Sequence, residues 1–136
     1  MSGTNSAVAT WRGGWHCDVE AGGFQLAVDE PKPAGGPGLG PRPTDLFMAS
    51  VASCYALAVA WAAGKEGVDL PDLEVTATGT YEGLKFAEIQ VNVRTSLERS
   101  QVQVLLDRAA QVCYVSNTLN LAPPLTVAHV EQTPPG

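Results

Sequence analysis

The feature that most constrains this chain is a stretch of 19 residues without a charged side chain, from Leu46 to Gly64. Its length meets the criterion for a membrane-spanning helix. However, seven alanines and two serines make it only modestly hydrophobic, and no basic cluster or aromatic belt flanks it. We therefore expect a helix buried on most sides at the centre of a soluble assembly. In a chain of 136 residues, so much covering usually requires a second subunit.

Length and charge narrow the class of protein. A chain of 136 residues with 45% hydrophobic content can bury one core, so we expect a single domain over residues 1–136, ordered over about 7–131. The net charge is −6 and the eight basic residues are scattered, which leaves no patch for phosphates or anionic lipid. We therefore expect neither nucleic acid nor a membrane as a partner. Residues 1–7 lack the pattern of a secretory signal, which predicts a cytoplasmic location.

Alternation of apolar and polar residues predicts six strands. The expected runs are 7–11, 15–20, 24–28, 73–81, 89–94 and about 125–130. The second and third runs meet at Gly22-Gly23, which is typical of a hairpin. Because each run has one apolar face, we expect mainly antiparallel sheet with one solvated face and one face packed against helices. The fold class is therefore α+β.

Two helices are predicted between these strands. The first follows Pro43, begins near Thr44 and ends near Gly67. The second opens with a capping-box pattern at Ser100–Gln103 and ends at about Cys113. A loop rich in proline and glycine, residues 31–43, precedes the first helix, and we interpret it as a lid or a crossing between subunits.

Cysteines carry the chemical signal. Cys54 lies inside the uncharged stretch and Cys113 lies at the end of the second predicted helix. In a reducing compartment, a bridge between such thiols is more often transient and catalytic than structural. The alternative is that both are small core residues, as we expect for Cys17. The cysteines and histidines lack zinc-ligand spacing, so we expect no metal, and we expect no cofactor.

On a helix, the neighbours of Cys54 are mostly apolar. They include three residues that we expect to contact a substrate: Phe47, Ser50 and Trp61. Burial among such side chains raises the pKa of a thiol, so a reactive Cys54 needs a cation or hydrogen-bond donors from another part of the fold.

Two segments resemble a known family. The run Gly40–Cys54 is similar to the helix opening and cysteine of the OsmC/Ohr family, which comprises osmotically inducible protein C and the organic hydroperoxide resistance proteins. The run Leu105–Asn117 is similar to the second cysteine box of that family, and the order of predicted elements matches over roughly residues 7–131. The resemblance implies an OsmC-like fold, with antiparallel sheets around a long central helix, in an intertwined homodimer with a cysteine site at the subunit interface.

The resemblance also implies an activity. In that family the first cysteine, here Cys54, attacks an organic hydroperoxide as a thiolate and becomes a sulfenic acid. The second, here Cys113, condenses with it to a disulfide that a dithiol reductant, typically of lipoyl type, reopens. Reactive members add an arginine, for which Arg12 and Arg42 are the candidates here.

This chain departs from the family pattern at one position. Reactive members carry a glutamate ten residues before the first cysteine, whereas this chain has Thr44. The nearest carboxylate, Asp45, falls about 180° round the helix from Cys54. With Thr44 and Asp45 in place of that glutamate, the chain resembles the broader OsmC-like branch of the family. This departure leaves open a second hypothesis, a non-catalytic dimer that binds a small hydrophobic ligand at the subunit interface.

Overall fold

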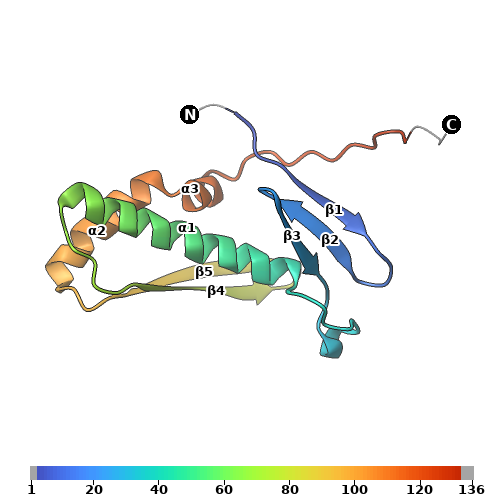
Figure 1. The fold of residues 1–136 in the computed structure, drawn as a ribbon, viewed down its shortest axis with the longest axis horizontal. Coiled ribbons are helices and arrows are strands. Elements are labelled where there is room, and N and C mark those ends of the chain that lie inside the picture. Colours follow the sequence, from blue (N-terminus) through green and yellow to red (C-terminus); the bar gives the residue numbers. More distant parts are fainter. Residues whose placement is uncertain (1–2, 133–136) are drawn as a thin grey trace.

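The computed structural model describes residues 3–132, and residues 1–2 and 133–136 lie outside it. A three-stranded antiparallel sheet has the order β1-β2-β3, and β4 and β5 form a separate antiparallel hairpin. Three α-helices follow or flank these strands (Figure 1), which confirms the α+β class. The elements in chain order are β1 (Ala7–Trp11), β2 (Cys17–Ala21), β3 (Phe24–Val28), the 3-10 turn η1 (Lys32–Ala34), α1 (Pro43–Glu66), β4 (Glu74–Glu82), β5 (Lys85–Arg94), α2 (Arg99–Val112) and α3 (Tyr114–Leu121).

The long helix α1 lies along one face of the β4–β5 hairpin (Figure 1). Alternation explains this packing, because Val75, Ala77 and Gly79 are half-buried while the threonines between them are exposed. A Cβ on Gly79 would lie 2.5 Å from the ring of Phe86. Glycine at this position therefore lets an aromatic side chain pack flat across the hairpin under α1.

The main core lies between α1 and α2. Small side chains on α1 let the two helices approach closely, and Leu105 fills the space between them with 1% of its surface exposed. The buried cluster is Ala58, Val59, Ala62, Ala63, Leu105, Ala109 and Cys113. The end of α2 is thus fixed against the middle of α1.

The opposite face of α1 is exposed in the single chain; the expected burial on most sides was for an assembly with a second subunit and stays a prediction. Leu57 is 72% exposed and Trp61 is 43% exposed. Pro43–Glu66 is long and apolar enough to cross a membrane by length and composition, and 28% of its apolar window is buried. The central helix of a soluble protein meets the same criterion, so the test does not separate the two.

The proline- and glycine-rich loop folds back on β3 through Asp29, whose side chain is almost fully buried. Its carboxylate accepts hydrogen bonds from the backbone N–H groups of Glu30 at 2.8 Å and Leu39 at 3.1 Å. A Cβ on Gly40 would lie 2.0 Å from the carbonyl oxygen of Ala27, so only glycine fits there. The loop is therefore held in one conformation at the start of α1.

We expect Asp29→Ala to lower the free energy of unfolding by about 1–3 kcal/mol, because two N–H groups lose their acceptor. Urea unfolding followed by circular dichroism measures the change. Asp69→Ala, at an exposed position, serves as the matched control. A loss equal to that of the control would contradict the assigned role of Asp29.

Four sequence predictions about elements need correction. Residues 125–130 form no strand: Leu125 and Val127 are 90% and 93% exposed, and no described strand of the same chain pairs with them. A strand needs a partner for its backbone groups, and alternation alone does not supply one. The second strand begins at Cys17, because residues 12–16 form a turn in which Arg12 N–H donates to the carbonyl of His16.

The other two corrections concern the helices at the end of the chain. The helix α2 begins at Arg99 with Glu98 as its N-cap and without a side-chain cap, so the predicted capping box at Ser100 is wrong. The helix α3 occupies the segment after Cys113, for which no helix was predicted.

Candidate active site

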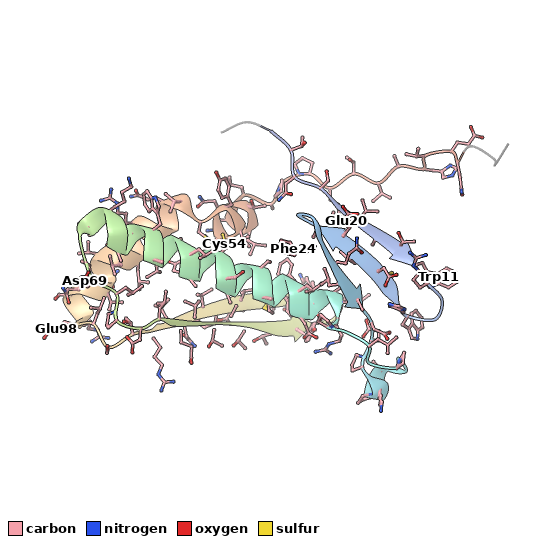
Figure 2. The ribbon with its side chains drawn as sticks, in the orientation of Figure 1. Trp11, Glu20, Phe24, Cys54, Asp69 and Glu98 are labelled. Atoms are coloured by element: carbon pink, nitrogen blue, oxygen red, sulfur yellow. The ribbon has the colours of Figure 1, made fainter. Side chains whose placement is uncertain are left out.

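The structure brings together two thiols that are 59 residues apart in the sequence. The sulfur atoms of Cys54 and Cys113 lie 3.4 Å apart, and both cysteines are free thiols. Cys54 projects from the middle of α1 (Figure 2), and Cys113 sits at the end of α2. The helix packing described above fixes this approach, because Cys113 belongs to the α1–α2 core.

The junction at Cys113 explains why both sulfurs face hydrogen-bond donors. Cys113 has an extended backbone (φ −79°, ψ 106°), ends α2 and is also the N-cap of α3. The first N–H groups of a helix have no partner within the helix, and they form the positive end of its dipole. Those of Tyr114 and Val115 lower the pKa of Cys54, and those of Val115 and Ser116 lower the pKa of Cys113.

The two thiols differ in acidity. Burial raises the pKa of Cys54, and the neighbouring Cys113 sulfur raises it further, against the two N–H donors. Burial also opposes ionisation of Cys113, but its donors outweigh this effect and lower its pKa. These donors are the hydroxyl and N–H of Ser116, the thiol of Cys54 and the N–H of Val115. More hydrogen-bond donors therefore favour the thiolate at Cys113 than at Cys54.

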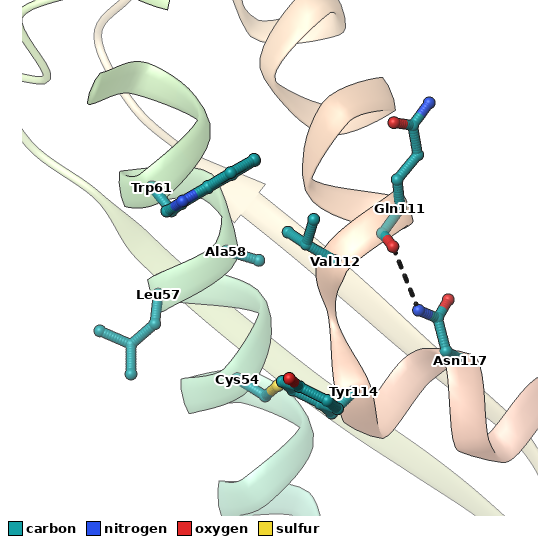
Figure 3. Close-up of a pocket in the computed structure, with 8 residues that line it drawn as sticks. All are labelled: Cys54, Leu57, Ala58, Trp61, Gln111, Val112, Tyr114 and Asn117. Atoms are coloured by element: carbon teal, nitrogen blue, oxygen red, sulfur yellow. Dashed lines mark hydrogen bonds between the residues drawn. The ribbon is translucent and has the colours of Figure 1, made fainter. Parts of the chain in front are cut away.

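A cavity of about 620 Å³ opens beside Cys54. Its walls are mostly apolar, with Cys54 and Tyr114 at one end and Trp61 at the other (Figure 3). The lining residues are Cys54, Leu57, Ala58, Trp61, Gln111, Val112, Tyr114 and Asn117. Cys113 does not line the cavity and is 1% exposed. A molecule in the cavity therefore meets the sulfur of Cys54 first.

Polar groups mark two places on the cavity wall. The indole of Trp61 lies 5.5 Å from the guanidinium carbon of Arg108 and 5.7 Å from Nζ of Lys65, within cation–π range. The side-chain amide of Asn117 donates to the carbonyl oxygen of Gln111 at 3.3 Å (Figure 3). The cavity can thus hold an apolar molecule, with the two cations at its Trp61 end and the thiol of Cys54 at the other.

Of the three residues expected to contact a substrate, the structure places one in this cavity. Trp61 lines it, whereas Phe47 stacks on Phe86 with ring centroids 5.9 Å apart. The hydroxyl of Ser50 donates to the carbonyl oxygen of Phe47 at 2.7 Å, within α1. Phe47 and Ser50 lie one to two turns before Cys54, outside the set of cavity-lining residues.

The two candidate arginines lie in ion pairs away from the thiols. Arg12 lies in the turn between β1 and β2, and its Nε donates a hydrogen bond to Oδ2 of Asp18 at 2.8 Å. This hydrogen bond lowers the pKa of Asp18. Arg42 pairs with Asp45 at 3.2 Å at the start of α1, which lowers the pKa of Asp45 in the same way. Within the described chain, the groups that shift the two thiols include the N–H groups of α3 and no guanidinium.

Sequence reasoning missed the N–H groups at the start of α3 and the wall residues Gln111 and Val112. The break between α2 and α3 lacks the usual signal, since cysteine is not among the preferred N-cap residues. Cys17 lies in β2, in the other sheet, and is half-buried. In residues 3–132, no group of three or more His, Cys, Asp or Glu side chains could hold a metal ion.

The fold and the site together define a class: α+β proteins in which a long central helix presents one thiol to a second thiol at a helix junction. The sequence profile described as OsmC-like protein matches residues 36–128, a range that includes both cysteines of the pair. The chain therefore belongs to the OsmC-like family. No curated protein sequence matches it.

Solved structures agree with this assignment. A putative organic hydroperoxide resistance protein from Vibrio cholerae, solved with captopril in one of its active sites, is 30% identical, with a TM-score of 0.67 over 88% of this chain and 87% of that chain. The organic hydroperoxide resistance protein OsmC from Legionella pneumophila is 27% identical, with a TM-score of 0.63 over 85% and 88%. A hypothetical protein from Aquifex aeolicus shares the fold at 12% identity, with a TM-score of 0.74 over 89% and 90%.

Proposed function

We propose that this protein reduces organic hydroperoxides with electrons from a dithiol, using Cys54 as the thiol that is oxidised and Cys113 as the resolving thiol. The observation that carries the proposal is the 3.4 Å contact between the two sulfurs, one of which lines an apolar cavity. The 30% identical Vibrio cholerae structure, which is named a putative organic hydroperoxide resistance protein, supports the same chemistry.

The reaction has two steps at the thiol pair. Cys54 attacks the terminal oxygen of the hydroperoxide, the O–O bond breaks, an alcohol leaves and Cys54 becomes a sulfenic acid. Cys113 then attacks the sulfur of Cys54, a disulfide forms and water leaves. Because a disulfide bond measures about 2.05 Å, the sulfurs approach by about 1.4 Å from their present separation. A dithiol reductant, of lipoyl type by resemblance, returns the pair to thiols.

The test is peroxide consumption by the reduced wild-type protein with dihydrolipoamide as the reductant. We expect turnover with cumene hydroperoxide, and we expect the Cys113→Ser variant to stop at a sulfenic acid on Cys54 that dimedone traps. Wild-type protein that consumes no hydroperoxide with any dithiol tried would refute the proposal. If Cys54 stayed reduced while the cavity bound cumyl alcohol, the result would favour the second hypothesis, a non-catalytic binding module.

The apolar cavity predicts a preference for organic substrates over hydrogen peroxide. Burying roughly 80 Å² of apolar substrate surface contributes about 2 kcal/mol, so we expect kcat/KM for cumene hydroperoxide to exceed that for hydrogen peroxide by at least about tenfold. We expect Trp61→Ala to erase most of that preference and to change the hydrogen peroxide rate by less than about twofold. The matched control is Trp15→Ala, at an exposed position outside the cavity. Equal rates for the two peroxides in the wild type would contradict the assigned role of the cavity.

We also propose that the working form is a cytoplasmic homodimer with the thiol pair near the subunit interface. Exposed apolar side chains on α1 and on the extended segment after α3, such as Leu57 and Val127, support an interface there. Sedimentation of the full chain tests this form, and a single species at the 14.2 kDa mass of one chain would contradict it.

A further inference from the structure

We propose that Cys113 has a role before resolution: it is the base that removes the proton from Cys54, and it then returns this proton to the departing alkoxide. The inference deepens the proposed function and rests on it. It assigns to one buried sulfur both the activation of the attacking thiol and the later formation of the disulfide.

The first argument is what contacts the sulfur of Cys54. The groups that the described chain places against it are the N–H groups of Tyr114 and Val115 and the sulfur of Cys113. An amide N–H only donates hydrogen bonds, whereas a thiolate accepts a proton. Of these three groups, Cys113 is therefore the one that can act as the base.

The second argument is that the surroundings of Cys113 favour the thiolate. Cys113 is the N-cap of α3, so its sulfur lies at the positive end of that helix, and the N–H groups of Val115 and Ser116 and the hydroxyl of Ser116 lower its pKa. The Ser116 hydroxyl also donates to the carbonyl oxygen of Cys113 at 3.3 Å. The same surroundings lower the pKa of Cys113, while burial and the adjacent sulfur raise the pKa of Cys54. In the structure, with both thiols protonated, Cys113 donates to the sulfur of Cys54 at 3.4 Å. In the pair that has lost one proton, we place the remaining proton on Cys54, and its S–H then donates to Cys113.

The third argument is access. Cys113 is 1% exposed and absent from the cavity lining, so a hydroperoxide in the cavity reaches Cys54 and not Cys113. The more acidic thiol is therefore the one that the substrate does not reach. Because Cys113 contacts Cys54 but not the cavity, it can exchange a proton with Cys54 and cannot attack the hydroperoxide. The higher pKa of Cys54 makes its sulfur the stronger nucleophile once the proton has left.

Nearby carboxylates are occupied by other partners. Asp45 accepts hydrogen bonds from Arg42 at the start of α1, and Asp107 on α2 accepts one from Gln103 at 2.9 Å. Neither is among the groups that shift the pKa of Cys54.

The steps balance in atoms and protons. The proton of Cys54 moves to Cys113, and the Cys54 thiolate attacks the terminal O–H oxygen of the hydroperoxide. The O–O bond breaks, the new S–O bond makes the sulfenic acid and the alkoxide takes the proton back from Cys113. Cys113 is again a thiolate, which attacks the sulfur of Cys54, and hydroxide leaves and takes a proton from solvent. The hydroperoxide is reduced by two electrons and the thiol pair is oxidised by two.

Three other titratable side chains lie around the pair: Tyr55, Asp107 and Tyr114. Tyr55 on α1 donates its hydroxyl to the carbonyl oxygen of Leu106, and burial followed by the charge of Cys113 raises its pKa. It therefore stays protonated at neutral and mildly alkaline pH. Tyr114 on α3 lines the cavity, and Asp107 on α2 lies beside Tyr55.

The test is the rate of the first turnover, measured against pH with reduced full-length protein, excess cumene hydroperoxide and no reductant. We expect Cys113→Ser and Cys113→Ala to lower this rate by about 10- to 100-fold near neutral pH. Since burial still raises the pKa of Cys54, the rates of both variants should climb with pH, while the wild-type rate reaches its plateau at lower pH. The matched control Cys17→Ser should follow the wild type.

A purely resolving Cys113 predicts a different result. It would leave the first-turnover rate and its pH profile unchanged in both Cys113 variants, and that outcome overturns the inference. A dimedone adduct found on Cys113 in the Cys54→Ser variant would overturn it too, because Cys113 would then be the nucleophile. Failure of the proposed function is distinct: the wild-type protein itself would show no oxidation of Cys54.

A second variant keeps the test valid if the Cys113 variants do not fold. Ser116→Ala retains both thiols but removes the hydroxyl that donates to the carbonyl oxygen of Cys113 at 3.3 Å and that lowers the pKa of its thiol. We expect the pH profile of the first turnover to move to higher pH, with the plateau retained. An unchanged profile would contradict the inference.

Discussion

Replacing Cys54 by serine should lower kcat/KM for hydroperoxide reduction by at least about a thousandfold. A hydroxyl ionises far less readily than a thiol, and its oxygen cannot form a sulfenic acid with a peroxide. The substitution is nearly isosteric at a half-buried helical position, so the fold should persist. Dithiol-dependent peroxide consumption measures the loss, and circular dichroism verifies the helix content.

The same chain offers a matched control for this prediction. Cys17→Ser removes a thiol of similar burial in the three-stranded sheet and should retain wild-type turnover. Residual activity above a few per cent in Cys54→Ser, with Cys17→Ser unaffected, would place the attack on another thiol. That result would contradict the assignment of Cys54.

The elements with local signals were predictable from sequence. The uncharged run at 46–64 predicted α1 to within about a residue at each end, since Pro43 and Gly67 bound the helix. The hairpin at Gly22-Gly23 formed as predicted, with β2 and β3 paired on either side. The predicted strand at 125–130 failed because alternation reports a half-buried face and not the partner that completes the hydrogen bonds.

The candidate site was predictable in part. Resemblance suggested Cys54 and Cys113 as a pair, but no pattern in the sequence gives the 3.4 Å contact, which depends on how α1 and α2 pack. The donors at the sulfurs are backbone N–H groups of α3, and a backbone group leaves no residue type to recognise. Arg12 and Arg42 were chosen for their charge, yet each lies beside a carboxylate that local sequence places within reach.

Replacing Leu105 by alanine should lower the free energy of unfolding by about 2–5 kcal/mol. Leu105 is 1% exposed and fills the contact between α2 and a face of α1 made mostly of alanines, including Ala58 and Ala62. Small neighbours have no side-chain length with which to fill the space, so a cavity should remain. Denaturant unfolding at fixed protein concentration measures the loss, and the fixed concentration keeps any subunit association comparable.

The matched control is Val104→Ala, one residue away on the same helix and 50% exposed, which should cost less than about 1 kcal/mol. Leu105→Ala should also affect the thiol pair, because Leu105 and Cys113 belong to one buried cluster. A loosened α2 should make the 3.4 Å approach of the sulfurs less frequent, so Leu105→Ala should slow both the first turnover, in which Cys113 acts as the base, and disulfide formation after oxidation of Cys54. A stability loss equal to that of the control, or a disulfide that forms at the wild-type rate in a clearly destabilised variant, would contradict this link between the core and the thiol pair.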